Sequence, residues 1–350
     1  MKAIFKRYQL NFKNPSGTSR GVLRTKETWF LILRDGNRMG IGECGLFRGL
    51  SYDDVPGYEQ KCEWVAANIE LGKEVLLGRL MDFPSIQFGL EQAFLSLESK
   101  NPFELFDTSF LRANEPIAIN GLVWMGDIDF MHWQIHEKLG QGFSCIKLKI
   151  GAIDFEAELA LLKSIRSSYS KNRVEIRVDA NGAFSPSEAL ERLKVLSALD
   201  LHSIEQPIKQ GQWEAMKKLC LETPLPIALD EELIGIISVT KKKELLLTVQ
   251  PQYIILKPSL LGGFNGCMEW IALAEQYNIG WWITSALESN IGLNAIAQWT
   301  ASLNTTMPQG LGTGSLFTNN LDSPLEVVNG GLYYNTNKRW KINLIEDLCS

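Results

Sequence analysis

The sequence predicts an α/β fold: a (β/α)8-type TIM barrel preceded by an α+β N-terminal capping domain. Two observations support this prediction. Short apolar runs alternate regularly with helical stretches after residue 116, and a different pattern of strands followed by helices precedes it. The chain has 350 residues, 45% hydrophobic and 21% charged, the balance of a globular protein with a large core. At about 150 residues per domain, this length allows two domains or one enlarged barrel.

Charge and cysteine usage exclude several classes of function. The chain has 35 Lys and Arg against 40 Asp and Glu, a net charge of −5, so we expect no nucleic-acid partner and no membrane partner. The six cysteines are scattered without a CxxC pair, which is typical of reduced thiols. Charges interrupt the N-terminus before a signal-peptide core could form, and no apolar run approaches the ~18 residues of a membrane helix. We therefore expect a cytoplasmic protein. With only three histidines, we expect an active site of carboxylates and lysines.

Residues 1–115 show the pattern of a small α+β domain. Two β-type runs, 29–33 and 39–43, flank a Gly-containing turn and predict a hairpin. Apolar residues at helical spacing predict helices over 58–71 and 85–98. Strands followed by helices in this order indicate a domain separate from the barrel.

From residue 116 onward, eight apolar, β-branched runs alternate with amphipathic helical stretches. The runs are 117–122, 145–150, 174–178, 203–205, 227–229, 253–256, 280–284 and 310–316. A polar residue or glycine lies in each run or directly after it, at intervals of 25 to 32 residues: Asn120, Lys147, Asp179, Glu205, Asp230, Lys257, Ser285 and Gly312. Eight units of this size predict a closed barrel over 116–317, with 318–350 returning to the capping domain. An open doubly wound sheet would carry a Gly-rich turn after its first strand, and none is present.

The strand ends carry charged residues in phase with the barrel. In such barrels, the C-terminal ends of the strands build the active site. Residues i and i+2 of a strand face the same side, so Lys147 and Lys149 point together, as do Arg177 and Asp179. Scattered buried ion pairs are the alternative interpretation. Charged residues at the ends of five successive strands favour a functional site.

Three of these residues are carboxylates on neighbouring strands: Asp179, Glu205 and Asp230. They would repel one another unless a cation neutralised them. Oxygen ligands without His or Cys suit Mg²⁺ rather than zinc. Lysines beside the ion could accept and donate a proton, because a nearby divalent cation and a second ammonium make a neutral lysine more accessible.

At these positions the sequence resembles the enolase superfamily, in its muconate-lactonising branch. The matching segments are Lys147-Leu148-Lys149, Asp179-Ala180-Asn181-Gly182, Glu205-Gln206-Pro207, Asp230-Glu231 and Lys257-Pro258. The resemblance covers nearly the whole chain, because that family also has an α+β capping domain. Within the branch, segments 17–21, 176–181, 285–289 and 310–313 look like the o-succinylbenzoate synthase family.

The resemblance implies a Mg²⁺-dependent lyase. Asp179, Glu205 and Asp230 would hold Mg²⁺, which Mn²⁺ could replace. Lys149 would remove the proton alpha to a substrate carboxylate and then protonate the departing hydroxyl on the same face. Lys257 would stay charged and stabilise the enediolate from the other face. The implied reaction is the syn-dehydration of 2-succinyl-6-hydroxy-2,4-cyclohexadiene-1-carboxylate in menaquinone biosynthesis.

Further residues would bind the small carboxylate substrate: Lys147, Arg177, Asn181, Ser285, Gly312 and Thr313. Lys147 and Arg177 would tune the electrostatics or hold a carboxylate. Segment 310–314 is Gly-rich, and it could contact a carboxylate through its backbone N–H groups or simply be a tight strand end. Glu231 is expected behind the metal ligands. The polar stretch 13–21 predicts a mobile loop, in which Thr18, Ser19 and Arg20 would cover the substrate.

Other functions remain open at this point. A racemase or epimerase needs two bases on opposite faces, and Lys149 and Lys257 would supply them. Dipeptide epimerases of this superfamily carry Asp-x-Asp at the end of strand eight, where this chain has Gly310-Leu311-Gly312. That difference argues against the dipeptide subgroup but leaves N-succinylamino acid racemisation open. A non-catalytic barrel that binds a small acid is a third hypothesis.

Several other motifs are better explained by ordinary structure. His132 and His136 have the spacing of helical zinc ligands but lack the glutamate of HExxH, so an outer helix surface is expected. Segment 17–21 has GxSxG spacing, but Pro15 precedes it and a strand follows, unlike a nucleophile elbow. A Schiff-base role for Lys257 is disfavoured by the three nearby carboxylates.

Overall fold

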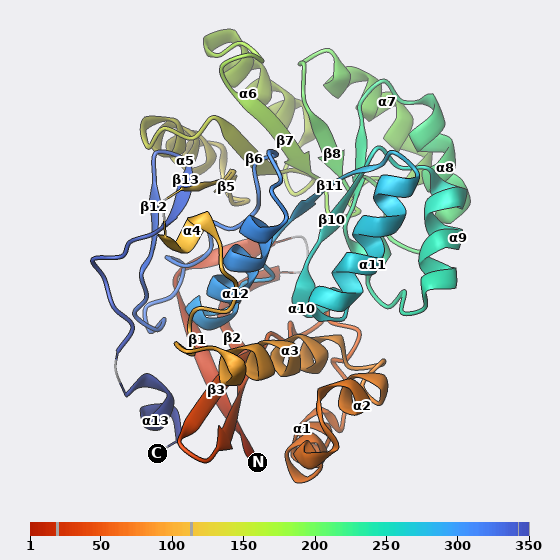
Figure 1. The fold of residues 1–350 in the computed structure, drawn as a ribbon. Coiled ribbons are helices and arrows are strands. Elements are labelled where there is room, and N and C mark those ends of the chain that lie inside the picture. Colours follow the sequence, from red (N-terminus) through yellow and green to blue (C-terminus); the bar gives the residue numbers. More distant parts are fainter. Residues whose placement is uncertain (19–20, 113–114, 342, 350) are drawn as a thin grey trace.

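The computed structural model describes residues 1–18, 21–112, 115–341 and 343–349. It contains a strand-rich unit at the N-terminal end of the chain and a barrel above it (Figure 1). In the described part of the chain, no helix is long and apolar enough to cross a membrane.

The barrel is built on a parallel sheet of seven strands in the order β11-β10-β9-β8-β7-β6-β5. The strands are β5 (Gly121–Val123), β6 (Cys145–Lys149), β7 (Glu175–Asp179), β8 (Ser203–Glu205), β9 (Ile227–Leu229), β10 (Tyr253–Leu256) and β11 (Gly280–Ile283). The connecting helices are α5 (Ile128–Gly140), α6 (Phe155–Ser168), α7 (Pro186–Ser197), α8 (Trp213–Glu222), α9 (Val239–Val249), α10 (Pro258–Leu261), α11 (Gly263–Gln276) and α12 (Asn290–Ser302). A 3-10 turn, Glu231–Leu233, follows β9. Sequential order along the sheet confirms the predicted barrel architecture.

The prediction of eight complete strand–helix units is wrong at the point where the barrel closes. The first predicted strand is divided into β4 (Ile117–Ala118) and β5, and only β5 belongs to the barrel sheet. The eighth predicted strand is reduced to Gln309 and Gly310, which bridge to Ile119 and Thr284. Glycines at every second position from 310 to 314 have low β-propensity, which accounts for the short pairing. No helix follows in the described residues 311–324.

The N-terminal unit is an antiparallel sheet of β1 (Lys2–Thr18), β2 (Gly21–Asp35) and β3 (Arg38–Cys44). Its helices are α1 (Tyr58–Ala67), α2 (Lys73–Gly78), α3 (Pro84–Glu98) and α4 (Ser109–Arg112), with a 3-10 turn at Ile69–Leu71. The predicted β2–β3 hairpin is confirmed, with Asp35 paired to Arg38. Helix α3 packs closely on β3: a Cβ on Gly42 would lie 1.9 Å from the Gly89 carbonyl oxygen, so only glycine fits there.

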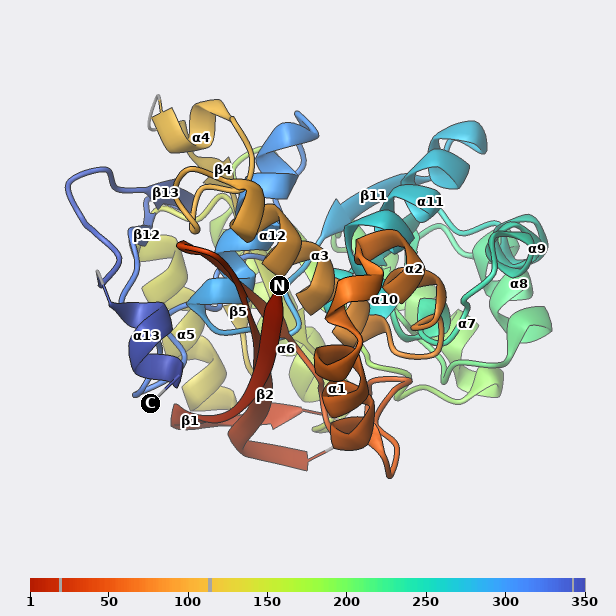
Figure 2. The same ribbon diagram turned by 60° about the horizontal axis from the view of Figure 1, so that its bottom comes forward.

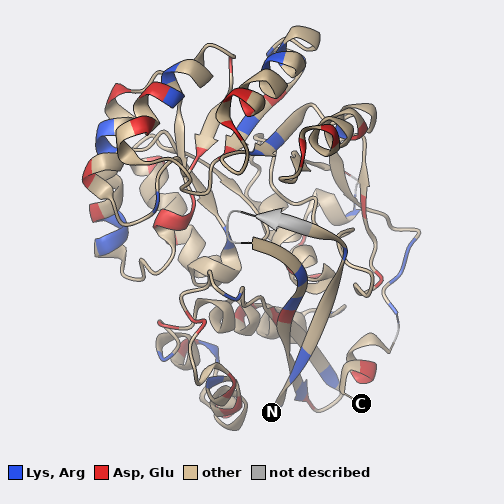
Figure 3. Ribbon diagram, turned by 180° about the vertical axis from the view of Figure 1, so that it is seen from behind, with Lys and Arg blue, Asp and Glu red and all other residues tan. Residues whose placement is uncertain are grey.

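The predicted loop over 13–21 is largely a β-ribbon. β1 continues through Thr18, and Ser16 and Gly17 pair with Leu23 and Val22 after a register shift that begins at Asn11. The shift accommodates the polar Asn-Pro segment without ending the strand. Seen from behind, the parts of β1 and β2 drawn in colour extend from the sheet toward the barrel (Figure 3). There the Lys13 N–H donates to the Leu316 carbonyl at 2.8 Å.

The C-terminal segment contacts both parts of the molecule. β12 (Leu325–Val328) and β13 (Gly331–Tyr334) extend β4 into a three-stranded sheet. Helix α13 (Leu344–Cys349) lies near the N-terminal strands (Figure 2). Leu344 and Leu348 share a buried cluster with Phe30 and Ile32 of β2.

Candidate active site

A cavity of about 320 Å³ lies at the C-terminal ends of the barrel strands. Its walls come from the strand ends, from the loops after β11 and after Gly310, from helix α5 and Phe143, and from two segments of the N-terminal unit. The polar lining residues include Lys13, Asn120, Lys147, Lys149, Asp179, Asn181, Lys257, Ser285 and Thr313. The sequence prediction missed the contributions of Lys13, Pro15, Phe47 and Leu50, which reach the cavity only through tertiary packing.

Charged residues occupy five adjacent positions around this mouth. Lys149 ends β6, Asp179 ends β7 and Glu205 ends β8, while Asp230 and Lys257 directly follow β9 and β10. The sheet order places these strands side by side, so the three carboxylates lie between the two lysines. The structure therefore brings together the predicted catalytic and metal-binding residues.

In the structure, the lysines pair with these carboxylates. Lys149 Nζ donates to Asp179 Oδ2 at 3.0 Å, and Lys257 Nζ donates to Asp230. Lys147 Nζ lies 2.6 Å from Glu205 Oε2 and 3.2 Å from Asp179 Oδ2. Asp179 Oδ2 thus serves two ammonium groups, whereas Glu205 Oε1 is buried without a hydrogen-bond partner among the described residues.

The two central carboxyl groups respond differently to burial. For Asp179, burial acts to raise the pKa, but Lys149 and Lys147 outweigh it and hold the pKa below its usual range. For Glu205, burial and the neighbouring Asp179 charge raise the pKa to about 8, although Lys147 opposes them. Burial acts to lower the pKa of Lys257, and the Asp230 and Glu205 charges reverse this and raise it. The lysines therefore stabilise the charged form of Asp179, whereas burial and the neighbouring Asp179 charge disfavour the charged form of Glu205.

The chemistry of these residues suits a hard divalent cation. Among the described residues, no group of three His, Cys, Asp or Glu side chains is arranged to hold a metal ion as it stands. In this arrangement Lys147 Nζ contacts one oxygen of Asp179 and one of Glu205. The side chains that could bind a metal here are nevertheless carboxylates, and Mg²⁺ prefers oxygen ligands. Glu205 Oε1, which has no hydrogen-bond partner among the described residues, could bind such a cation.

Asn181 connects Lys149 to Glu231 through hydrogen bonds. Its Oδ1 accepts a hydrogen bond from Lys149 Nζ at 2.7 Å, and its Nδ2 donates to Glu231 Oε1 at 3.0 Å. Asn181 has a left-handed backbone with φ of 43°, which asparagine tolerates better than most residues. This conformation turns the amide back toward Lys149. Glu231 stands behind Asn181 and does not line the cavity.

The residues predicted on strands seven and eight meet at the opposite wall. Ser285 Oγ and Thr313 Oγ1 are 2.6 Å apart, and both side chains are buried. Gly312 also lines the cavity, next to Asn120. Short polar groups here are suited to hydrogen bonding with an anionic or carbonyl oxygen.

Arg177 is not brought to the cavity, contrary to the expectation of a substrate contact. Its Nε donates to Glu175 Oε1 at 2.7 Å and its Nη1 to the Pro308 carbonyl at 2.9 Å. The guanidinium lies 4.3 Å from the centroid of the Trp282 ring, inside the barrel. Arg177 lies on the same face of β7 as Asp179, but its side chain turns away from the mouth. The two-residue period of a strand predicts the face of a residue but not the direction that a long side chain takes.

The predicted capping-loop residues cannot be placed at the substrate. Ser19 and Arg20 lie outside the described residues, and only the backbone of Thr18 is described. Instead, Lys13, Asn14 and Pro15 of the same hairpin line the cavity. The hairpin is therefore part of the wall, at residues earlier in the chain than those predicted.

Comparisons with known proteins agree with this geometry. The Enolase C-terminal domain-like family matches residues 131–338. The o-succinylbenzoate synthase of Desulfotalea psychrophila is 48% identical, covering 95% of this chain and 98% of the relative. The crystal structure of MenC from the same organism superposes with a TM-score of 0.84 and 45% identity, covering 95% of this chain and 99% of that one. The L-Ala-D/L-Glu epimerase of Bacillus subtilis shares the fold, with a TM-score of 0.81, 20% identity and coverage of 95% and 96%. The chain therefore belongs to the enolase superfamily, in the family that contains the Desulfotalea synthase.

Proposed function

We propose that the protein is an o-succinylbenzoate synthase, a lyase that dehydrates 2-succinyl-6-hydroxy-2,4-cyclohexadiene-1-carboxylate in menaquinone biosynthesis. One observation carries the proposal: the order Lys149, Asp179, Glu205, Asp230, Lys257 on five adjacent strands. The near full-length similarity to the Desulfotalea synthase selects this reaction among those of the superfamily.

Enzymes of this superfamily use a divalent metal, typically Mg²⁺. Asp179, Glu205 and Asp230 would hold Mg²⁺, and Mn²⁺ could replace it. When bound, the ion supplies positive charge beside the substrate carboxylate, where negative charge develops during the reaction.

Lys149 is the base in this proposal. Its nitrogen takes the proton from the carbon alpha to the ring carboxylate, giving an enediolate. Asn181 holds the same nitrogen through its amide oxygen, which fixes the direction of the lone pair. The resulting ammonium returns the proton to the neighbouring hydroxyl on the same face. The carbon–oxygen bond then breaks, water leaves, and the new double bond completes the aromatic ring.

Lys257 and Lys147 act through their charge. Lys257 lines the cavity from the far side of the carboxylates, so its ammonium stabilises the enediolate from the other face. Lys147 lies between Asp179 and Glu205 and balances their charge. Ser285 and Thr313 on the opposite wall orient the substrate through hydrogen bonds.

The direct test is turnover of the purified protein with the cyclohexadiene substrate and Mg²⁺. We expect an aromatic product to form, detected by its ultraviolet absorbance and confirmed by mass spectrometry. A folded, Mg²⁺-supplemented protein that produces no o-succinylbenzoate would reject the proposal.

N-succinylamino acid racemisation is a second candidate because Lys149 and Lys257 flank the carboxylates from two sides, as a 1,1-proton transfer requires. Incubating N-succinyl amino acids in D₂O tests it. Deuterium at the alpha carbon of both enantiomers would support racemase activity, and no exchange would remove this candidate.

A further inference from the structure

The segment between β11 and α12 forms part of the cavity wall with an unusual backbone. Ala286 and Leu287 both line the cavity. Leu287 has φ of 64°, in the left-handed region that large side chains avoid. Such a conformation persists only where surrounding contacts enforce it, and it is often found at functional sites.

Glu288 holds the residue that precedes Leu287. It is fully buried, and its Oε2 accepts the Ala286 N–H at 2.7 Å. Its Oε1 accepts the Ser259 hydroxyl at 2.5 Å. On the other side, Leu287 N–H donates to Ser285 Oγ at 3.3 Å. Since Ser259 lies two residues after Lys257, one carboxylate joins the wall at 285–287 to the turn that follows this lysine.

The N-terminal unit contributes the charge around Glu288. Lys26 of β2 is buried, and its Nζ has no hydrogen-bond partner among the described residues. Glu43 and Glu288 are the acidic groups whose charge acts on it. Glu43 in turn accepts the N–H groups of Ser289 and Gly292, each at 2.9 Å, at the start of α12. Glu288 is thus enclosed between the barrel and the N-terminal sheet.

We propose that Glu288 is a positioning residue that holds the Ser285–Leu287 wall in its left-handed conformation against the substrate and couples it to the turn behind Lys257. This inference rests on the proposed function, because the wall is argued to orient that substrate. Glu288 itself does not line the cavity, so its effect passes through Ala286, Leu287 and Ser259.

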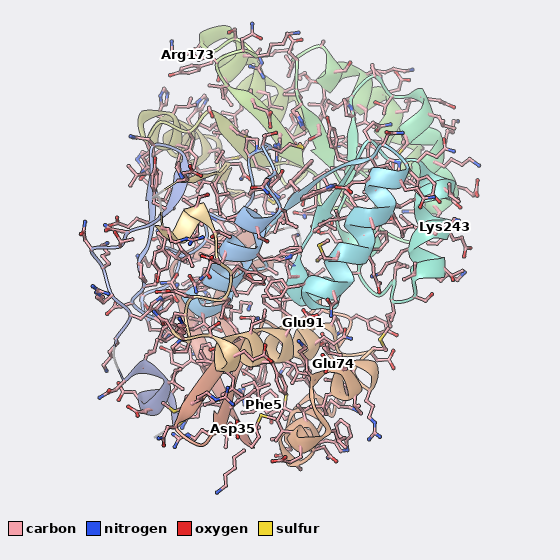
Figure 4. The ribbon with its side chains drawn as sticks, viewed as in Figure 1. Phe5, Asp35, Glu74, Glu91, Arg173 and Lys243 are labelled. Atoms are coloured by element: carbon pink, nitrogen blue, oxygen red, sulfur yellow. The ribbon has the colours of Figure 1, made fainter. Side chains whose placement is uncertain are left out.

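Glu91 of α3 is a matched control. Figure 4 labels it at the boundary between α3 and the barrel. It is buried, and it accepts the N–H groups of Phe264 and Asn265 at 2.5 and 3.2 Å, at the start of α11. It lines a second, separate cavity and none of the active-site cavity. Glu91→Ala therefore removes a comparable set of bonds without touching the substrate wall.

The experiment compares Glu288→Ala, Glu288→Gln and Glu91→Ala in the full-length protein with Mg²⁺. The measurements are kcat and KM for the dehydration, the Kd of o-succinylbenzoate by calorimetry, and the thermal midpoint. We expect Glu288→Ala to raise KM and Kd about tenfold, with a smaller fall in kcat, because the wall relaxes. Glu288→Gln should stay within about threefold of the parent, since its amide oxygen can accept from Ala286 and its nitrogen can donate to Ser259.

Glu91→Ala should lose thermal stability while KM and Kd stay unchanged. The proposal is overturned if Glu288→Ala leaves KM and Kd unchanged, if Glu288→Gln is as impaired as Glu288→Ala, or if Glu91→Ala raises KM equally. If Glu288→Ala does not fold, Ser259→Ala replaces it, and a rise in KM of less than twofold there overturns the proposal. Failure of the proposed function can be distinguished from failure of the Glu288 proposal, because in the first case the parent protein itself would form no product.

Discussion

Lys147 and Arg177 are direct neighbours across β6 and β7, yet they serve two different regions of the barrel. Lys147 extends to the mouth, where it shares Asp179 Oδ2 with Lys149. Arg177 turns inward to Glu175, the Pro308 carbonyl and the Trp282 ring. In the interior, Arg177 Nε and Nη1 have partners of their own, while its Nη2 has no hydrogen-bond partner among the described residues. At the mouth, Lys147 and Lys149 share Asp179, Lys147 also contacts Glu205, and Lys257 pairs with Asp230. Glu205 Oε1 has no hydrogen-bond partner among the described residues. The two regions differ in their access to the cavity. Lys147, Lys149 and Asp179 line it, so a ligand there can exchange partners with them, whereas Arg177 does not reach it.

Replacing Lys149 by Ala should produce the largest effect on the mouth. A positioned general base contributes about 10²–10⁴-fold to the rate, so kcat should fall by that factor. The fold should be retained, because Asp179 keeps its contact with Lys147. Steady-state kinetics and a thermal melt of the same preparation measure both effects. A kcat within tenfold of the parent would show that Lys149 is not the base.

Removing divalent metal should also act on the mouth alone. Chelation followed by dialysis should abolish turnover, and added Mg²⁺ should restore it. Mg²⁺ at 100 times its Kd should raise the free energy of unfolding by about 2.7 kcal/mol. Glu205→Gln should remove most of this gain, whereas Arg177→Met should keep it in full. The measurement is a denaturant titration with and without Mg²⁺, and an undiminished gain in Glu205→Gln would exclude Glu205 as a ligand.

Arg177→Met should affect stability and leave substrate binding intact. The change removes a buried cation from Glu175, the Pro308 carbonyl and the Trp282 ring, at a cost of about 3 kcal/mol in the free energy of unfolding. KM should stay within about twofold of the parent, since the side chain does not reach the cavity. A raised KM with an unchanged free energy of unfolding would indicate that Arg177 contacts the substrate after all.

Much of the mouth could be predicted from the sequence because the C-terminal ends of all barrel strands lie at the same face of the barrel. The phase of Lys149, Asp179, Glu205, Asp230 and Lys257 along the chain was sufficient to bring them together. Arg177 was misplaced because a period of two fixes the face of a strand but not its depth, and two residues correspond to about 6.6 Å along it.

The rest depended on contacts between distant parts of the chain. Lys13 and Phe47 reach the cavity only because the N-terminal sheet packs against the barrel. No local pattern shows that the Asn14–Pro15 segment would shift register and remain paired. The left-handed backbone of Leu287 is likewise not signalled by the sequence, because leucine has no preference for that conformation.

Glu91 is a buried carboxyl group remote from both regions, and its ionisation should make the free energy of unfolding depend on pH. Burial raises the pKa of Glu91 to about 7, above its ordinary value of 4.5, although the Phe264 and Asn265 N–H groups oppose it. The folded state therefore binds this proton more tightly than the unfolded state, and stability falls as pH rises through the window between the two values. From pH 5 to pH 7 the loss should be about 2 kcal/mol, and Glu91→Gln should lack it. Denaturant titrations of both proteins at pH 5, 6 and 7 measure the difference. Parallel pH profiles would show that Glu91 does not titrate in this window, and the stability of the contact between α3 and α11 would then be independent of its charge.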